Sequence, residues 1–141
     1  MESLVVYSDG GARGNPGIAG AGFVIADKQG GTIYEGAKPL GVTTNNQAEY
    51  WALIFALEWL EDNAKKHPEL TFKLDSKLIV EQLKGNYKVK NAGLKPMFVR
   101  VQELLTKIKP KSHDFVHIPR RQNKKADELA NLAMDQQQNE K

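Results

Sequence analysis

Four acidic residues border apolar stretches of the sequence, where predicted strands end or predicted helices begin. Asp9 follows "SLVVYS" and Asp75 follows "LTFKL", whereas Glu49 and Asp127 fall in the expected first turns of two helices. A carboxylate held against apolar residues without a partner is energetically costly. The chain has no cysteine, so a metal would take oxygen or imidazole ligands, and clustered carboxylates are typical of Mg²⁺ and Mn²⁺ sites.

Each of these acids, taken alone, also has an ordinary structural explanation. Glu49 and Asp127 suit the positive ends of helix dipoles, and aspartate is common in turns. The placement of Asp9 and Asp75 favours a shared site, because ligand and catalytic groups of open α/β sheets gather outside the carboxyl ends of strands. If the two strands are parallel neighbours, both carboxylates lie at the same edge.

The elements that must position these acids follow from the apolar pattern. Strands are predicted within residues 3–9, 20–27, 31–37, 70–76 and 113–119, and helices within 43–67, 77–85, 94–108 and 123–136. A three-strand antiparallel meander followed by strand–helix alternation predicts an α/β fold of order βββαβααβα. The last two strands join the meander parallel to its first strand, which gives a mixed five-stranded sheet with helices on both faces. We expect one domain over residues 1–135 and a flexible tail over residues 136–141.

Composition and charge narrow the class of protein further. The 141 residues contain no apolar run of about 18 residues and no signal-peptide pattern, so we expect a cytoplasmic protein without membrane contact, and a monomer. The segment 84–125 carries twelve Lys and Arg against two acids. Such asymmetry indicates either a polyanionic partner such as nucleic acid or a solvated helical face.

Four stretches in this order and spacing resemble the motifs of type 1 ribonuclease H: "YSDGGARGNPGIAGAG", "TTNNQAEYWALIFALEWL", "LDSKLIVEQLKGNYKVKN" and "HIPRRQNKKADELAN". The resemblance covers nearly the whole chain and is greatest to the short, archaeal-type subgroup without a hybrid-binding domain. It implies the ribonuclease H-like fold. It also implies an endonuclease that hydrolyses the RNA strand of RNA/DNA hybrids, leaving 5′-phosphate and 3′-hydroxyl ends.

The resemblance makes Asp9, Glu49, Asp75 and Asp127 the catalytic carboxylates, which would hold two Mg²⁺ or Mn²⁺ ions. In the family's mechanism, one ion lies between the counterparts of Asp9 and Asp127 and activates the attacking water. The other is held by the counterparts of Asp9, Glu49 and Asp75 and stabilises the leaving oxygen. Two such ions clamp an in-line displacement at phosphorus.

The same resemblance implies contacts to the nucleic acid. The backbone of Gly10, Gly11 and Arg13 would approach the RNA, and donors to 2′-hydroxyls or bases would come from Asn15, Asn45, Asn46 and Gln47. Phosphate contacts would come from Thr44, Lys88, Lys90 and Asn91. Helix capping is the alternative role of Asn45 and Asn46, and Asn15 also fits a simple turn.

The chain departs from the family pattern in two places. The mobile loop histidine of many members is missing from "IPRRQNKK", so we assign its place to Arg120, with Arg121 as the second choice and a structural role for His117. The basic protrusion of larger members is abbreviated to "KGNYKVKNAGLK". Tyr87 there would contact a sugar or anchor the core. Four aromatic residues of the long helix are expected in the core, namely Tyr50, Trp51, Phe55 and Trp59.

Two alternative functions stay open at this point. The same site could act also or mainly on double-stranded RNA, which the short subgroup sometimes cleaves. A non-catalytic hybrid-binding module on the same fold would normally have lost one or more of the acids, and all four are present.

Overall fold

A five-stranded sheet organises the chain in the computed structural model, which describes residues 2–139. The strands are β1 (Ser3–Gly14), β2 (Gly17–Asp27), β3 (Thr32–Thr43), β4 (Glu69–Leu74) and β5 (Ser112–His117). Their spatial order is β3-β2-β1-β4-β5. The first three strands form the antiparallel meander, and β4 and β5 run parallel to β1. The mixed sheet predicted from the sequence is therefore confirmed.

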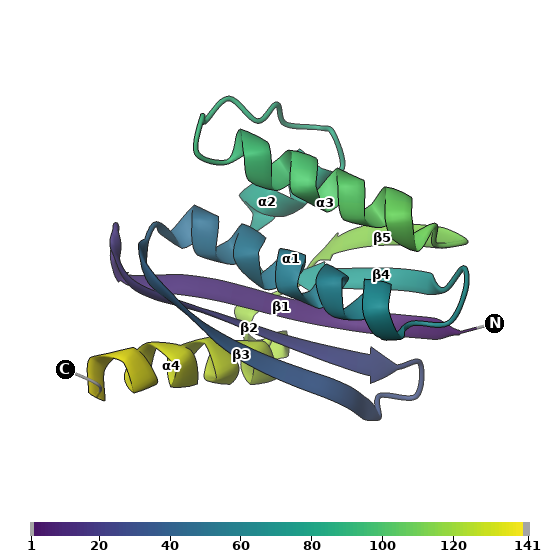
Figure 1. Ribbon diagram of the computed structural model, residues 1–141, viewed down its shortest axis with the longest axis horizontal. Helices are drawn as coiled ribbons and strands as arrows, with labels where there is room; N and C mark the ends of the chain where they lie inside the picture. Colours follow the sequence, from purple (N-terminus) through teal and green to yellow (C-terminus); the bar gives the residue numbers. More distant parts are fainter. Residues whose placement is uncertain (1, 140–141) are drawn as a thin grey trace.

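Helices cover both faces of this sheet (Figure 1). One face carries α1 (Asn45–Asn63), α2 (Lys77–Leu83) and α3 (Lys95–Ile108), whereas α4 (Lys124–Asn139) packs on the other face against β1, β2 and β3. A short 3₁₀ helix, η1 (Arg120–Gln122), connects β5 to α4. The element order βββαβααβα is confirmed. Among residues 2–139, no helix is both long and apolar enough to cross a membrane.

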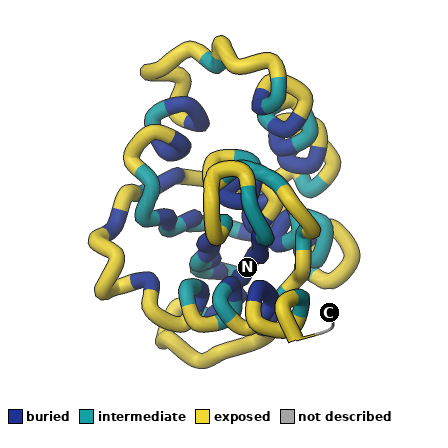
Figure 2. Tube along the Cα trace, turned by 90° about the vertical axis from the view of Figure 1, so that its left-hand side faces the viewer, coloured by how far each residue is buried: buried dark blue, intermediate teal, exposed yellow. Residues whose placement is uncertain are grey.

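The main core lies between the sheet and the helices α1, α2 and α3. Val6, Phe72 and Leu57 are completely buried there, and Figure 2 shows the buried positions gathered inside a shell of exposed loops. Tyr50 is also buried and donates its hydroxyl to Gln82 Oε1 at 2.8 Å. The expectation that Trp51 is a core residue is wrong, because its side chain is 38% exposed and stacks on Phe55 at the surface.

Strand β1 extends beyond the point where the apolar pattern places its end. It continues through the glycines to Gly14 and pairs with β2 over its whole length, so Asp9 lies inside the strand and opposite Gly22. The parallel pairing with β4, however, ends at Ser8 and Leu74. Asp9 and Asp75 are thus the first residues beyond the shared ladder, which brings them to the same edge as expected.

Helix α1 begins one residue after Thr44, which is its N-cap. The Thr44 side chain accepts a hydrogen bond from the Gln47 backbone N–H, and the Gln47 side-chain oxygen accepts one from the Thr44 backbone N–H, which together form a complete capping box. Capping is therefore the role of Thr44 and not of Asn45 or Asn46. Because the helix starts at Asn45, Glu49 lies in its second turn, and the expected first-turn position is wrong.

Helix α4 continues to Asn139, so residues 136–139 are helical and the expectation of a flexible tail is wrong for them. Residues 140 and 141 lie outside the described residues. Gln137 explains the ordered end, because its Nε2 donates to Ala19 O and its Oε1 accepts from Gly41 N, both at 2.7 Å. Ala19 and Gly41 are register partners in β2 and β3, and a register shift follows directly between Ala19 and Gly20.

Replacing Gln137 with alanine is expected to lower the free energy of unfolding by about 1–2 kcal/mol, because two backbone groups lose their partners. Thermal or urea unfolding measures this change. Gln136→Ala is the matched control, since Gln136 is exposed on the same helix. Equal effects of both substitutions would show that the Gln137 bonds add nothing.

Candidate active site

Three of the four predicted carboxylates converge at the edge where β1 and β4 part. Asp9 on β1, Glu49 on α1 and Asp75 after β4 each offer an oxygen, and these oxygens all lie within 4.8 Å of one another. Asp9 and Glu49 are each only 6% exposed. Residues 26 to 66 positions apart in the sequence are thus assembled into one cluster.

The approach of α1 to β1 depends on Gly10. A Cβ atom there would lie 2.1 Å from the backbone oxygen of Ala48, so only glycine allows the helix this close to the strand. The Gly10 backbone N–H then donates to Glu49 Oε1 at 3.1 Å. The lack of a side chain at Gly10 therefore allows the helix to pack against the strand. Gly11 has more space, because a Cβ atom there would lie 3.8 Å from its nearest contact, Met134 Cε.

Burial and mutual repulsion disfavour the charged forms of these acids. Burial is the main reason why the pKa of the Asp9 carboxyl rises from 3.8 to about 7, and a hydrogen bond with Glu49 opposes this rise. The negative charges of Asp75 and Asp127 contribute to the same rise. Burial, followed by the interaction with Asp9, raises the pKa of Glu49 well above its ordinary value. Such perturbation is typical of functional sites.

The cluster has the donor set of a hard divalent cation. Glu49 Oε2 is buried and has no hydrogen-bond partner, and within residues 2–139 no lysine or arginine forms an ion pair with Asp9, Glu49, Asp75 or Asp127. Three close carboxylates that lack a cationic partner are stabilised by a bound cation. Their oxygen-only chemistry suits Mg²⁺ or Mn²⁺.

Asp127 lies in the first turn of α4, as predicted, but outside the three-residue cluster. It shares with Asp9 a hollow of about 360 Å³. The wall of the hollow includes several residues for which the sequence suggested roles in catalysis or nucleic-acid contact, namely Gly10, Gly11, Arg13, Asn45 and Arg120. Arg120 in η1 is exposed. The structure thus brings a cationic side chain to the carboxylates without neutralising them.

The asparagines at the rim of this hollow are linked to one another. Asn15 Oδ1 accepts the Asn45 backbone N–H at 2.9 Å, and Asn45 Oδ1 accepts the Ala12 backbone N–H at 2.8 Å. Both side-chain oxygens are used within the protein. The NH₂ group of each amide can still donate to other acceptors, and Asn46 is exposed beside them.

Arg13 is tied to helix α4. Its guanidinium forms an ion pair with Asp135 at 2.8 Å and also hydrogen-bonds Asn131 and Gln138. The side chain is 33% exposed, so it is partly available at the surface.

The loop 84–94 carries the remaining basic candidates and lies beyond α2 and α3 (Figure 1). Lys88 and Lys90 are exposed there and do not line the hollow that contains Asp9 and Asp127. Tyr87 is 45% exposed, so it is not a core anchor. Asn91 lies near the start of α1, because Gly93 is close to both Asn91 Oδ1 and the side-chain amide of Gln47.

His117 and Arg121 are exposed, and neither lines the hollow. His117 ends β5, opposite Leu74 in the parallel ladder.

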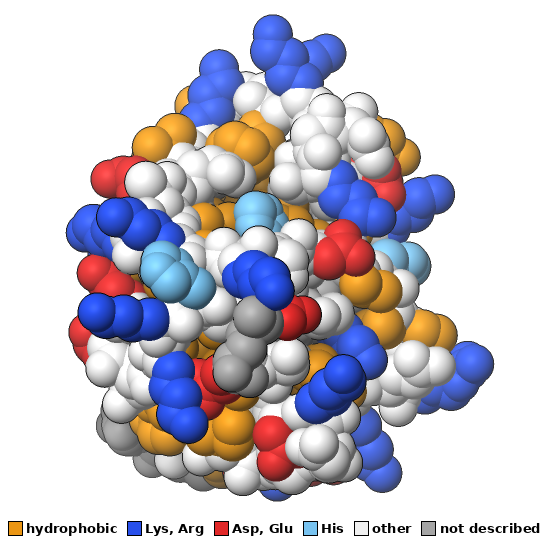
Figure 3. Space-filling model, turned by 90° about the vertical axis from the view of Figure 1, so that its right-hand side faces the viewer, with side chains coloured by type: hydrophobic (Ala, Val, Ile, Leu, Met, Phe, Trp, Pro, Cys, Tyr) orange, Lys and Arg blue, Asp and Glu red, His pale blue; other side chains and the backbone are white. Residues whose placement is uncertain are grey.

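Figure 3 shows the end of the molecule around the first residues of β1, where Lys and Arg side chains are interspersed with acidic ones. Positive charge therefore does not form one continuous patch on that face.

Two buried polar residues at the site were not singled out from the sequence. Asn123 and Ser8 are each 1% exposed, and Asn123 hydrogen-bonds Asp75. Asn123 is the first residue of the predicted helical range 123–136, where asparagine is ordinarily interpreted as a cap, so the local pattern contained no signal of this contact.

Comparisons with known proteins identify a family and several similar chains. The model of the reverse transcriptase-like family matches residues 7–133. A ribonuclease HI of Halobacterium salinarum is 44% identical over 92% of this chain and 63% of its own length. The structure of LC11-RNase H1, isolated from compost by a metagenomic approach, is 48% identical with a TM-score of 0.90, covering 96% of this chain and 98% of that one.

A second structure of LC11-RNase H1 was solved in complex with an RNA/DNA hybrid. It is 45% identical, with a TM-score of 0.87, and covers 94% of this chain and 97% of that chain. The chain spans less than two thirds of the length of the first curated relatives that it matches.

Proposed function

The chain belongs to the ribonuclease H family, and we propose that it hydrolyses the RNA strand of RNA/DNA hybrids in a reaction that needs divalent cations. The observation that carries this proposal is the convergence of Asp9, Glu49 and Asp75 within 4.8 Å. Support for the substrate comes from the relative at 45% identity that was solved with an RNA/DNA hybrid.

We assign the cation ligands to this chain's own carboxylates. Asp9, Glu49 and Asp75 would hold one Mg²⁺ or Mn²⁺, and Asp9 together with Asp127 would hold a second. When bound, the two cations would supply activation of the attacking water and stabilisation of the leaving oxygen, giving 5′-phosphate and 3′-hydroxyl ends. The burial of Asp9 and Glu49 keeps these ligands in place and restricts competing contacts with solvent.

The residues around the hollow would bind and orient the hybrid. The NH₂ groups of Asn15 and Asn45 can donate to 2′-hydroxyls or to base acceptors in the minor groove, because their oxygens are already occupied. Gly11 lines the same hollow, and Asn46 and Gln47 follow Asn45 in the first turn of α1. Thr44, Asn91, Lys88 and Lys90 are candidates for more distant phosphate contacts.

The purified protein should be offered end-labelled RNA/DNA hybrid, double-stranded RNA and double-stranded DNA, each with Mg²⁺, Mn²⁺ or EDTA. We expect cleavage of the RNA strand in the hybrid, and none in EDTA. Cleavage of double-stranded RNA alone would favour the alternative substrate. Tight hybrid binding without cleavage under any metal condition would instead indicate a binding module.

Arg120→Ala is expected to lower kcat for hybrid cleavage about 10- to 100-fold, the effect of losing a charge-assisted hydrogen bond of about 1.5–3 kcal/mol to the scissile phosphate. Arg120→Lys should recover only part of this loss, because an ammonium lacks the planar fork of donors. Single-turnover cleavage measures both. A larger loss from Arg121→Ala would transfer the role to Arg121.

A further inference from the structure

Asn123 joins three elements of the site through one buried side chain. Its Nδ2 donates to the backbone oxygen of Ser8 on β1 at 2.8 Å and to Asp75 Oδ2 at 3.0 Å. These contacts span 115 and 48 residues of the sequence. Asp75 follows β4 and is only partly buried, so the bond from Asn123 restricts a carboxylate that would otherwise have freedom to rotate.

The backbone of Asn123 fixes a second carboxylate. Its carbonyl oxygen accepts the N–H of Asp127 at 3.1 Å, and its own N–H donates to Arg120 O at 2.9 Å. The same residue therefore sets where α4 begins relative to β1 and β4. Asn123 therefore hydrogen-bonds two carboxylate residues from different elements, Asp75 through its side chain and the backbone of Asp127 through its carbonyl oxygen.

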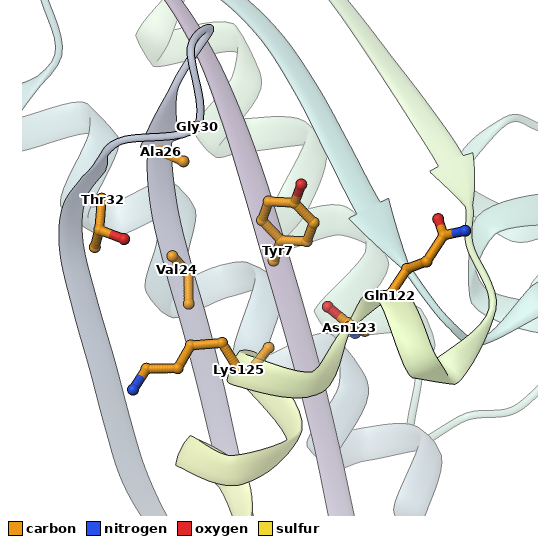
Figure 4. Close-up of a pocket in the computed structure, with 9 residues that line it drawn as sticks. Tyr7, Val24, Ala26, Gly30, Thr32, Gln122, Asn123 and Lys125 are labelled. Atoms are coloured by element: carbon orange, nitrogen blue, oxygen red, sulfur yellow. The ribbon is translucent and has the colours of Figure 1, made fainter.

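The remaining amide atom of Asn123 shows that the side chain does not cap α4. Its Oδ1 is buried and has no hydrogen-bond partner. Asn123 also lines a cavity of about 190 Å³ between the sheet and the start of α4, where Figure 4 shows its amide oxygen turned toward Tyr7. Since Ser8 O and Asp75 Oδ2 are both acceptors, only the nitrogen can face them.

The buried Asn123 amide does not give the most stable packing at this position, because its Oδ1 has no hydrogen-bond partner. A buried oxygen without a hydrogen-bond partner in the protein costs about 1–3 kcal/mol, and an apolar side chain would avoid that cost but would leave Ser8 O and Asp75 Oδ2 without this donor. The amide is therefore explained by the two acceptors that its nitrogen serves, and one of them, Asp75, belongs to the carboxylate cluster.

We infer that Asn123 is a positioning residue, which holds the Asp75 carboxylate in the orientation that lets Asp9, Glu49 and Asp75 share a divalent cation. This inference rests on the proposed function for the identity of the cluster as a cation site. Outer partners of metal ligands commonly tune metal affinity 10- to 100-fold, and Asn123 is such a partner.

The test compares wild type with Asn123→Leu and Asn123→Ala. Calorimetric titration with Mg²⁺ alone, without nucleic acid, should show affinity weakened about tenfold or more in both variants. With hybrid at a fixed Mg²⁺ concentration, kcat should fall, whereas KM for the hybrid should stay within about twofold, because Asn123 is buried and does not offer its side chain to a ligand at the surface.

Gln82→Leu is the matched control, because Gln82 is also a buried amide, 5% exposed, and its hydrogen bond goes to Tyr50 rather than to a carboxylate. It should lose thermal stability and keep the wild-type Mg²⁺ affinity. Unchanged Mg²⁺ affinity in the Asn123 variants, with only a stability loss like that of Gln82→Leu, would overturn the inference.

A measurement on wild type covers the case in which neither Asn123 variant folds. The Asn123 side-chain NH₂ signals, followed by NMR, should remain protected from exchange with solvent at saturating Mg²⁺, since the bond to Asp75 must persist in the loaded site. Loss of protection, or no Mg²⁺ binding by wild type, would overturn the inference. Failure of the proposed function is distinct, because it would show as Mg²⁺ binding and protection without hybrid cleavage.

Discussion

Asp9→Asn is expected to reduce hybrid cleavage by at least about 10³-fold while the protein remains folded. The side chain keeps its shape but loses the charge that we place between both cations. Cations contribute several kcal/mol of transition-state stabilisation in such reactions, and each 1.4 kcal/mol is a factor of ten in rate. Single-turnover cleavage of an end-labelled hybrid at saturating Mg²⁺ measures the loss.

Asp114→Asn is the control for this substitution, because Asp114 is an exposed aspartate on β5 and does not belong to the cluster. It should cleave at the wild-type rate. Far-ultraviolet circular dichroism and thermal unfolding check that Asp9→Asn is folded. Activity of Asp9→Asn within tenfold of wild type would contradict the assignment of Asp9 as a cation ligand.

The parts of the fold that the sequence predicts well are those encoded by local pattern. Among residues 2–139, apolar periodicity located all five strands and all four α-helices but not the 3₁₀ helix η1, since the strands and α-helices bury side chains at regular intervals. The end of β1 was misplaced because "GGARG" has the composition of a turn. Pairing of these glycines with Gly17–Ala21 of β2 overrides their weak strand propensity, so the strand end depends on a partner that a local window does not contain.

The carboxylates of the site were identifiable because the ends of parallel strands meet at one sheet edge. The close approach of α1 to β1, which brings Glu49 to the cluster, could not be predicted. It depends on the contact of Gly10 with the Ala48 backbone, 38 positions away in the sequence. The exposure of Trp51 could not be predicted from the sequence either. The apolar residues of α1 surround most of the helix, so periodicity does not distinguish its exposed side from its buried side.

In the cation-free protein, we expect the ionisation of Asp9 to make the free energy of unfolding depend strongly on pH. Between pH 3.8 and about 7, folded Asp9 binds a proton that the unfolded chain has released, so the free energy of unfolding falls as pH rises through this window. The stabilising proton is fully present below pH 3.8 and is lost above about 7. Raising this pKa from 3.8 to about 7 corresponds to about 4 kcal/mol, and Glu49 acts in the same direction.

Asp9→Asn removes a charge that is buried at neutral pH, so in EDTA at pH 7.5 the variant should unfold several degrees above wild type. At pH 3.5 the two should unfold at similar temperatures, because Asp9 is then protonated in the folded wild type and mostly protonated in the unfolded wild type. Mg²⁺ should raise the unfolding temperature of wild type at pH 7.5, and have little effect on Asp9→Asn. Thermal unfolding in EDTA and in Mg²⁺ at both pH values gives these comparisons. If wild type and variant respond identically to pH in EDTA, burial of Asp9 does not perturb its ionisation, and the cluster would then need no cation to relieve it.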